Sequence, residues 1–408
     1  MAHVPKSVII VGGSLAGLFH GLYLKRHGSD VVILEQDPRA IRSSHQAGIA
    51  FGPAVEEILA KYDDTAMQSC TPSVATRFAY RKRPNFKDLN IIRHLTSWGL
   101  LYRILRANFD GLASDAVPNP PPPRKGDGKA EYRSGKKVTK LEYENGLVTV
   151  GFVGEDGTEE TLKADLVIGA DGVHSTVRTL LQAPTTKEYS GYVAWRGTIL
   201  EKDLPPETAA YFANRTCINL LKKTYIVCYA IPPDTGTFHP STRLLNWVWY
   251  STPSSPPSIL TLNSILTSTQ STTTTTPHKT TVPTGLVRPA IWQAQKLSTT
   301  TGLPLAAPPF AQLLAATPTR SVFVTKVTDA LCDRAVFWEG KVVLVGDALA
   351  TFRPHFAVAT EQAARAPLDA LMGHSWMTVT QASHRASSSQ SVTQGGWSTA
   401  GVLTEVPP

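Results

Sequence analysis

The first forty residues alternate between apolar runs and glycine-bounded turns in a pattern that predicts a β-α-β unit. Residues 7–11 (SVIIV) are an apolar, β-branched run typical of a buried strand. Leucines then recur at helical spacing in LAGLFHGLYLKRHG, and Gly28 is expected to end this helix. A second apolar run, residues 30–36 (DVVILEQ), predicts the next strand. Strand, glycine turn, helix and strand within about thirty residues favour a parallel sheet covered by helices.

Later segments predict more buried strands and a region of antiparallel strands. Two apolar runs end in a turn that carries an acid, in residues 164–178 (ADLVIGADGVHSTVR) and 341–347 (KVVLVGD). Residues 136–157 predict a hairpin, because an Asn-Gly pair separates two alternating stretches. Between residues 189 and 250 the chain is rich in aromatic strands, among them GYVAWRG and LLNWVWY. A parallel sheet and an antiparallel sheet are therefore both expected in this chain.

Several segments show neither the hydrophobic spacing of a helix nor the alternation of a strand. Residues 119–129 are a proline-rich loop, and residues 251–285, rich in Ser, Thr and Pro, are expected to be a disordered or loosely packed loop. Residues 361–372 (EQAARAPLDALM) have helical composition, but Pro367 is expected to interrupt the helix. Residues 373–408 show no periodicity and predict an irregular tail.

Composition describes a globular protein with room for two domains. The chain has 408 residues, of which 42% are hydrophobic and 18% charged, and its net charge is +8. Its basic residues are dispersed except at 77–83 (RFAYRKR), which is typical of a solvated strand edge or of a face that attracts an anionic cofactor. We expect no nucleic-acid partner and no stable membrane insertion. Four cysteines without metal-ligand spacing favour reduced thiols, a cytoplasmic location and no metal site.

The glycine turn after the first strand suits a dinucleotide. Gly12 and Gly17 permit a tight turn that brings the helix N-terminus close to a diphosphate. Ser14 takes the second glycine position of G-x-G-x-x-G and still leaves room for phosphate. Glu35 ends the second strand about 20 residues on, where a carboxylate can bind ribose hydroxyls. The alternative for Glu35 is an acid that faces solvent after a strand.

Three motifs together resemble a known family. VGGSLAG with Glu35, GADGVHSTVR and VGDALATFRP match in order and distance the class A flavoprotein aromatic hydroxylases, the p-hydroxybenzoate hydroxylase superfamily. The resemblance extends to about residue 372, and GYVAWRG, NWVWY, GLVRP and RPH resemble the branch that contains 2,6-dihydroxypyridine 3-hydroxylase. It implies an α/β fold in which a Rossmann-like FAD-binding domain, with a mainly parallel sheet, is interleaved with a mostly antiparallel β-sheet substrate domain. Residues 1–75, 95–185 and 335–372 would form the FAD-binding domain, and residues 76–94 and 186–334 the substrate domain.

The resemblance also implies cofactor contacts. Asp347 would accept a hydrogen bond from the ribityl hydroxyls of FAD, opposite Glu35. Arg103 would lie beside the phosphate and ribityl region, and its alternative is a charge on a helix surface. Asp171 would lie near the diphosphate or help the nicotinamide cofactor to bind. Its alternative is to cap the following helix together with Gly172.

Further cofactor contacts follow from the same resemblance. Ala47 and Gly48 would lie against FAD, while Pro354 and the helix start that contains Ala359 would border its isoalloxazine ring. Relatives usually carry a glycine after this proline, whereas this chain has Ala357 and Ala359. The added methyl groups put the affinity for flavin in question.

Residues for the substrate come from the aromatic strands and from the loop after Pro354. Candidate contacts are Tyr192, Trp195, Arg196, Trp247 and Trp249, whose alternative role is packing within the sheet. His355 would bond the substrate hydroxyl or remove its proton, or it only shapes its loop. His45 is a second histidine candidate.

The sequence thus predicts an FAD-dependent monooxygenase that hydroxylates a phenolic or hydroxylated N-heteroaromatic small molecule. By the resemblance it would use NADH or NADPH and O2 through a flavin C4a-hydroperoxide. One alternative is a flavoprotein oxidase or dehydrogenase on the same scaffold. Another is a degenerate, non-catalytic homologue, suggested by the alanines after Pro354, by Pro367 and by the irregular tail. The sequence is compatible with a homodimer.

Overall fold

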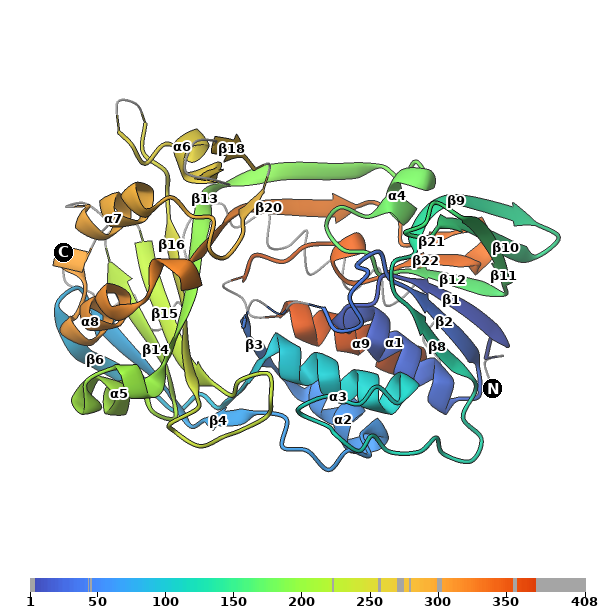
Figure 1. Ribbon diagram of the computed structural model, residues 1–408, viewed down its shortest axis with the longest axis horizontal. Coiled ribbons are helices and arrows are strands. Elements are labelled where there is room, and N and C mark those ends of the chain that lie inside the picture. The colour runs from blue at the N-terminus through green and yellow to red at the C-terminus, as the bar shows by residue number, and fades with distance from the viewer. Residues whose placement is uncertain are drawn as a thin grey trace.

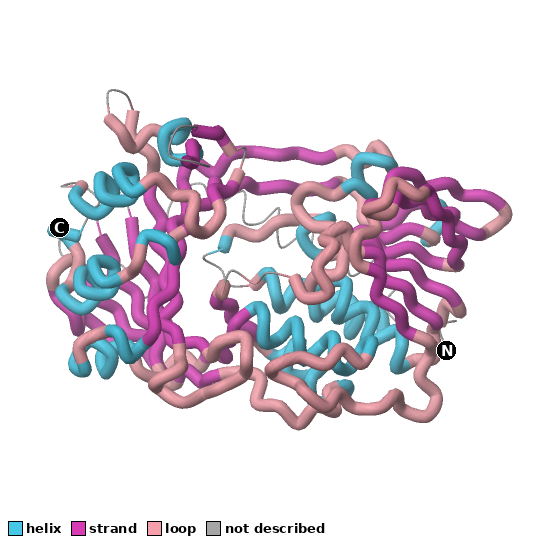
Figure 2. The backbone as a smooth tube through the Cα atoms, in the orientation of Figure 1, coloured by secondary structure: helices cyan, strands magenta, loops and turns pink. Residues whose placement is uncertain are grey.

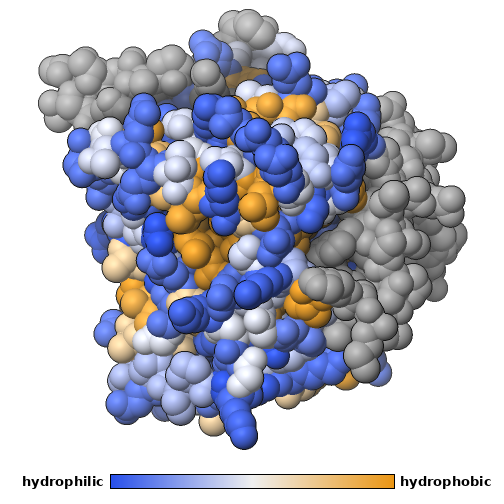
Figure 3. Space-filling model, turned by 90° about the vertical axis from the view of Figure 1, so that its right-hand side faces the viewer, coloured by the Kyte–Doolittle hydropathy of each residue, from blue (hydrophilic) through white to orange (hydrophobic). Residues whose placement is uncertain are grey.

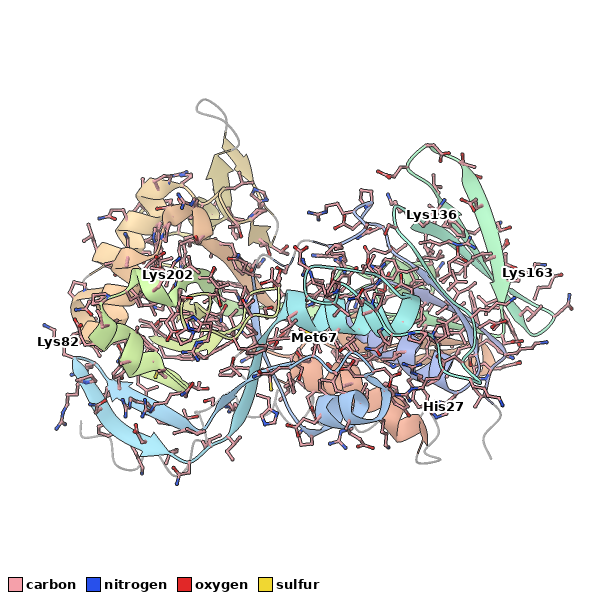
Figure 4. All side chains as sticks on the ribbon, turned by 60° about the horizontal axis from the view of Figure 1, so that its bottom comes forward. His27, Met67, Lys82, Lys136, Lys163 and Lys202 are labelled. Carbon is pink, nitrogen blue, oxygen red and sulfur yellow. The ribbon has the colours of Figure 1, made fainter. Side chains whose placement is uncertain are left out.

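The structure is a computed structural model that describes residues 4–42, 44, 46–221, 224–255, 258–269, 275–278, 280–298, 303–354 and 358–371. Its strands form two large sheets, one in each half of an elongated molecule (Figure 1). Figure 2 shows helices on the outer side of one sheet and between the two sheets. Figure 4 labels Lys82 and Lys163, which lie at opposite ends of the molecule.

The first sheet, here called the parallel sheet, has the strand order β21-β22-β12-β1-β2-β8. All neighbours are parallel except β21 and β22 at one edge. The predicted β-α-β unit is present, and its helix α1 ends before Gly28, whose φ is +87°. Since the parallel strands all end at the same edge, the residues that follow them lie together there. The bounds are β1 Ser7–Val11, β2 Asp30–Leu34, β8 Ala130–Arg133, β12 Leu166–Gly169, β21 Val336–Phe337 and β22 Val342–Leu344.

The parallel sheet is buried on both faces, which explains its continuous apolar runs. In β1, Val8 and Ile10 pack against helices, whereas Ile9 packs against a small sheet, β11-β10-β9. β9 and β10 form the predicted hairpin, with its turn at Asn145 (φ 53°) and Gly146 (φ 78°). The bounds are α1 Leu15–Arg26, α2 Pro53–Tyr62, α3 Trp98–Asp110, α4 Thr176–Leu180, α9 Ala359–Leu371, β9 Lys137–Glu144, β10 Leu147–Val153 and β11 Glu159–Ala164.

The second sheet, here called the antiparallel sheet, has the order β19-β20-β13-β16-β15-β14-β5-β6, with one parallel pair, β14 and β5. Helices α5 to α8 cover one of its faces around a core that contains Trp292. The long strands β13 and β20 pair with each other and run along the top of Figure 1 from one half to the other. The bounds are β5 Ala75–Tyr80, β6 Arg83–Leu89, β13 Thr185–Leu200, β14 Arg215–Leu221, β15 Thr224–Ile231, β16 Leu244–Ser251, β19 Thr281–Val282, β20 Phe323–Cys332, α5 Pro206–Phe212, α6 Leu262–Leu266, α7 Pro289–Leu297 and α8 Pro308–Ala316.

Smaller elements join the halves. The sheet β3-β7-β4 leads from the helices of the first half to β5. A hairpin of β17 and β18 precedes β19, and single turns of 3₁₀ helix punctuate the loops. The bounds are β3 Gly48–Phe51, β4 Thr71–Ser73, β7 Arg93–Ser97, β17 Thr267–Thr269, β18 Thr275–Pro277, η1 Glu201–Asp203, η2 Leu303–Leu305, η3 Thr319–Ser321, η4 Trp338–Gly340 and η5 Gly346–Ala348.

Two expectations about irregular segments need correction. The described part of residues 251–285 contains α6 and strands, and its Leu260, Ile265 and Val282 are buried in the core, so these apolar residues fix the segment. Helix α9 continues through Pro367. Loss of the proline N–H costs about 3 kcal/mol, and packing of α9 against α1 and α2 offsets this cost. The tail, residues 373–408, lies outside the described residues.

The face of the molecule in Figure 3 is mostly hydrophilic. At the end that carries β9 to β11, hydrophobic side chains form patches between hydrophilic ones (Figure 3). Since roughly half of a folded protein's surface is apolar, such patches need no ligand to explain them. No helix among the described residues is both long and apolar enough to cross a membrane.

Candidate cofactor and substrate site

The glycine turn after β1 lies at the carboxyl edge of the parallel sheet. Gly12 has a φ of +103°, and a Cβ there would lie 2.5 Å from the carbonyl oxygen of Ala170. A Cβ at Gly17 would lie 2.0 Å from the carbonyl oxygen of Gly12. Ser14 is the N-cap of α1, but its side chain makes no capping hydrogen bond. The first N–H groups of α1 therefore remain available for an anion.

Glu35 follows β2 at the same edge and is buried, with 3% of its surface exposed. Its Oε2 accepts a hydrogen bond from the Gly13 N–H (2.9 Å), and its Oε1 accepts one from the Asp37 N–H (2.9 Å). Arg42 Nη1 lies 3.3 Å from Oε2. Glu35 thus holds the glycine turn against the end of β2, rather than facing solvent. Each carboxylate oxygen has a further lone pair for a ribose hydroxyl.

Asp171 follows β12 and caps α4. Its Oδ2 accepts hydrogen bonds from the N–H groups of Thr176 (2.6 Å) and Val177 (3.0 Å). Burial raises its pKa above the usual value, while these hydrogen bonds lower it. Its Oδ1 is buried and has no hydrogen-bond partner in the described part of the chain. The helix-capping alternative is therefore observed, and the second oxygen remains available for a ligand.

Asp347 lies in the turn after β22, at the opening of the same edge. Gly346 precedes it with a φ of +56°, and a Cβ there would lie 3.0 Å from Ala16 Cβ, so this turn packs on the first turn of α1. The Asp347 side chain is accessible to solvent, yet it is surrounded by enough protein that desolvation raises its pKa to about 6. None of the described residues donates a hydrogen bond to its carboxylate. Asp347 is thus a free acceptor at the predicted position.

Arg103 in α3 forms contacts that the sequence did not predict. Its Nη1 donates to the carbonyl oxygen of Gly99 (3.0 Å) and lies 3.4 Å from Asp234 Oδ2, in the loop between β15 and β16. Ser44 Oγ also donates to Asp234 Oδ2. Only 15% of the Arg103 side chain is exposed. Arg103 is therefore neither a free surface charge nor an unpaired one, and it joins the two halves of the molecule.

The segment of residues 46–48, here called the cofactor segment, lies between the two sheets. Ala47 accepts a hydrogen bond from the Trp98 N–H (2.9 Å). Gly48 is buried and pairs with Ser97 in β7. Its N–H donates to Asn246 Oδ1 of the antiparallel sheet (3.0 Å).

The loop before α9 is described only in part. Pro354 is half-buried, and Ala359, the first residue of α9, is exposed. His355 and Ala357 lie outside the described residues, as does His45. The roles expected for the two histidines therefore stay predictions.

Cross-strand register defines the face of the antiparallel sheet that is turned toward the cofactor segment, here called the substrate face. One row across β13, β16 and β15 is Thr198, Asn246 and Tyr229. The next rows are Arg196, Val248 and Val227, and then Ala194, Tyr250 and Tyr225. Thr198 Oγ1 donates to Gln46 Oε1 (3.2 Å), next to the contact of Asn246 with Gly48. The substrate face therefore meets the cofactor segment at its first row.

Three tryptophan candidates lie on the opposite face. Trp195, Trp247 and Trp249 are fully buried in the core beneath the helices. Trp247 stacks on Trp292 with ring centroids 5.5 Å apart, and its Nε1 donates to Thr317 Oγ1 (3.0 Å). Since neighbours in a strand point to opposite faces, these tryptophans cannot share a face with Arg196. The expected substrate contact is therefore corrected to the alternative, packing.

The substrate face is positively charged and rich in tyrosine. Among the described residues, neither Arg93 of β7 nor Arg196 has an acidic partner. Burial raises the pKa of Tyr229 above its usual value, and both arginines lower it. Burial also raises the pKa of Tyr250 to about 12 and that of Tyr192 above its usual value. These hydroxyls stay protonated at neutral pH and can donate hydrogen bonds to an anion.

Comparisons with known proteins agree with this arrangement. An FAD binding domain model matches residues 6–56, and an FAD binding domain-like model matches residues 189–329. The 2,6-dihydroxypyridine 3-monooxygenase of Paenarthrobacter nicotinovorans is 27% identical over 365 residues, which cover 88% of this chain and 80% of that protein. The solved 2,6-dihydroxypyridine-3-hydroxylase of Arthrobacter nicotinovorans superposes with a TM-score of 0.72 at 25% identity, over 92% of this chain and 86% of the other. The chain belongs to the FAD-binding monooxygenase family.

Two further proteins are similar to this monooxygenase over a shorter stretch or with a lower TM-score. The 6-hydroxynicotinate 3-monooxygenase of Pseudomonas fluorescens is 29% identical over 204 residues, 48% of each chain. HpxO of Klebsiella pneumoniae, solved with FAD and uric acid, shares the fold with a TM-score of 0.62 at 18% identity, over 89% of this chain and 78% of that one. The predicted α/β fold, with its FAD-binding parallel sheet and mostly antiparallel second sheet, is confirmed.

Sequence reasoning missed part of the site of this monooxygenase. Asn246, Tyr229 and Tyr250 on the substrate face were not among the candidates, and neither were Arg93 and Asp234. The signal for Asn246 and Tyr250 was the two-residue period of LLNWVWY, which separates them from Trp247 and Trp249. No local signal marks Arg93 or Asp234, because each meets the site through strand pairing or a long loop.

Proposed function

We propose that this monooxygenase hydroxylates a phenolic or hydroxylated N-heteroaromatic small molecule, with NADH or NADPH as electron donor and O2 as oxidant. The observation that carries the proposal is the substrate face, on which Arg196 and several tyrosines line the side of the sheet that meets the cofactor segment. The similarity to a 2,6-dihydroxypyridine 3-monooxygenase and a 6-hydroxynicotinate 3-monooxygenase supports the same substrate class.

FAD fits the residues at the carboxyl edge of the parallel sheet. The first N–H groups of α1, which follow the turn at Gly12 and are not capped by the Ser14 side chain, would bind its diphosphate. Glu35 would bind the ribose, and the unpaired carboxylate of Asp347 would accept hydrogen bonds from ribityl hydroxyls. The buried, unpaired Oδ1 of Asp171 adds an acceptor near the diphosphate. When bound and reduced, FAD supplies the oxygen-transfer chemistry.

Arg196 and Arg93 would hold the substrate in its ionised form. A nearby positive charge favours the anion of a ring hydroxyl, and that anion makes the ring more electron-rich. The tyrosine hydroxyls would donate hydrogen bonds to the ring oxygens, because their raised pKa keeps them protonated. Val227 and Val248, in the row of Arg196, would help to keep water away. His355 is proposed as the group that takes the proton from the substrate hydroxyl.

The test uses the purified protein, its visible spectrum and a panel of dihydroxypyridines, hydroxynicotinates and simple phenols. We expect the absorption bands of oxidised flavin, loss of these bands with NADH or NADPH, and faster loss in the presence of one ionisable aromatic. We also expect a product that has gained one oxygen atom, detected by mass spectrometry. Flavin reduction by the aromatic alone would instead favour the oxidase or dehydrogenase alternative. A protein that cannot be reconstituted with FAD would contradict the proposal and favour the degenerate alternative.

A further inference from the structure

The first row of the substrate face holds the cofactor segment at two points. Thr198 and Asn246 are cross-strand neighbours on β13 and β16. Thr198 Oγ1 donates to Gln46 Oε1 (3.2 Å), and Asn246 Oδ1 accepts from the Gly48 N–H (3.0 Å). Two adjacent side chains on the antiparallel sheet thus form hydrogen bonds with two residues of the cofactor segment. This segment continues into the other half of the molecule as β3.

A side chain at position 48 would collide with Asn246, which occupies that space. A Cβ on Gly48 would lie 2.5 Å from Asn246 Cγ and 2.7 Å from its Nδ2, far inside normal contact distance. The backbone of Gly48 is not in the left-handed region, so its conformation does not itself require glycine. Glycine is therefore required at this position for steric reasons, and the atoms that would collide with a larger side chain belong to the antiparallel sheet.

Asn246 is almost fully buried where it meets Gly48. Only 4% of its surface is exposed, and its Nδ2 is buried without a hydrogen-bond partner among the described residues. The amide oxygen accepts from the Gly48 N–H, so removing the amide would leave that buried N–H without its acceptor, which is costly. The hydrogen bond that the structure gives to this amide oxygen is thus with the neighbouring backbone.

We propose that Asn246 is a positioning residue that seats Gly48 and thereby fixes the cofactor segment at the distance from the substrate face that FAD requires. The inference rests on the proposed function, in which the cofactor segment borders FAD. It assigns the glycine at position 48 to contact between the two sheets and not to close approach of the cofactor. Substitution of Asn246, which lies on the antiparallel sheet, should therefore change the affinity for flavin.

The test is a double-mutant cycle of Gly48→Ala, Asn246→Ala and the double variant, with free FAD as the probe. Quenching of flavin fluorescence gives each dissociation constant, and the visible spectrum reports the surroundings of bound FAD. We expect Gly48→Ala to weaken FAD binding at least tenfold because its methyl group collides with the amide. Asn246→Ala should weaken it about threefold to tenfold by loss of the hydrogen bond. The double variant should bind FAD about as well as Asn246→Ala alone, since the collision is gone.

Two outcomes of this cycle would overturn the proposal. If the double variant is weaker than Gly48→Ala by the full effect of Asn246→Ala, the two residues act independently and the proposal is overturned. It is also overturned if neither substitution changes FAD affinity or the flavin spectrum. Binding and turnover by the unmodified protein test the proposed function separately, so a failed cycle with an active parent rejects only the role of Asn246.

Asn219 is a matched control for loss of a buried amide. It lies on β14 of the same sheet, its Oδ1 accepts from the Ala307 N–H (2.9 Å), and it is fully buried on the helix side. Asn219 Nδ2 also donates to the carbonyl oxygen of Arg81 (3.0 Å), so Asn219→Ala should lower the melting temperature at least as much as Asn246→Ala and leave FAD affinity of the folded protein unchanged. Equal losses of FAD affinity in the two variants would mean that general destabilisation, and not positioning, explains the effect, which would overturn the proposal.

Discussion

The two sheets present their functional residues in different ways. In the parallel sheet the residues follow the strands, so Glu35, Asp171 and Asp347 reach one edge because their strands share a direction. In the antiparallel sheet the residues lie within strands, and their face depends on odd or even position. Arg196 faces the cofactor segment, whereas its neighbour Trp195 is buried in the core.

This difference determines what a mutation should do. The strand-end residue Asp347 can be removed with little change in packing, because its side chain is exposed. A residue within a strand is either part of the substrate face or part of the core, and adjacent positions should therefore differ completely. The comparison predicts separate effects on cofactor affinity, turnover and stability.

The largest expected effect separates Arg196 from Trp195. Arg196→Met should lower kcat/KM for an anionic aromatic about 100-fold, because losing the partner of a buried charge costs about 2–5 kcal/mol. FAD affinity should stay unchanged. Steady-state kinetics with the substrate found in the panel, together with an FAD titration, check this result.

Trp195→Phe is the matched variant on the other face. It should lower the melting temperature, since Trp195 Nε1 loses its hydrogen bond to Ser251 Oγ (3.0 Å), and keep kcat/KM within about threefold of the parent. An equal loss of kcat/KM in both variants, measured well below the melting temperatures, would remove the distinction between the two faces.

The next effect concerns the edge of the parallel sheet. Asp347→Ala should weaken FAD binding roughly tenfold to 100-fold, because hydrogen bonds to a charged acceptor are worth about 1.5–3 kcal/mol. Asp165→Ala is the control, since Asp165 lies at the opposite edge and accepts hydrogen bonds from the N–H and Oγ of Ser7. Fluorescence titration should show a loss for Asp347→Ala alone. Equal affinity in the Asp347→Ala and parent proteins would contradict the cofactor role of this edge.

Strand ends could be predicted from the sequence because local signals mark them. The turn at Gly12 and the acids Glu35 and Asp347 each follow a short apolar run, and the direction of a βαβ unit then brings them together. The hairpin at Asn145 was equally local. These predictions needed no knowledge of distant contacts.

The substrate face could be predicted only in part. Aromatic residues alternate in LLNWVWY, but sequence alone did not show which of the alternating positions faces the cofactor segment. Trp195 and Trp247 were therefore chosen with Arg196, although they lie on the other side. Arg103 was seen as a cofactor contact, yet its pairing with Asp234 depends on a loop more than a hundred residues away. Contacts of this kind arise from tertiary packing and leave no local pattern.

A smaller effect should appear in the pH dependence of FAD binding. Desolvation raises the pKa of Asp347 to about 6, so the free protein is half-protonated there near pH 6. Ribityl hydroxyls that donate to Asp347 favour its ionised form, and below pH 6 binding must therefore release a proton. FAD affinity should fall as the pH decreases, by at most about tenfold between pH 7 and pH 5. Titrations across this range should show the fall in the parent and a flatter profile in Asp347→Asn; identical profiles would assign the dependence to another group.

The smallest effect tests whether the substrate face and the strand ends are joined through the cofactor segment. Thr198→Val keeps the shape of the side chain and removes the hydrogen bond to Gln46 Oε1. Gln46 is exposed, so water can replace part of the lost bond, and FAD affinity should fall only about twofold to threefold. Because Thr198 and Asn246 are cross-strand neighbours that hold the same segment, Thr198→Val combined with Asn246→Ala should differ from the sum of the two effects in free energy. Strict additivity in FAD titrations would show that each contact acts alone, and the two sheets would then be linked by separate hydrogen bonds and not by one shared support.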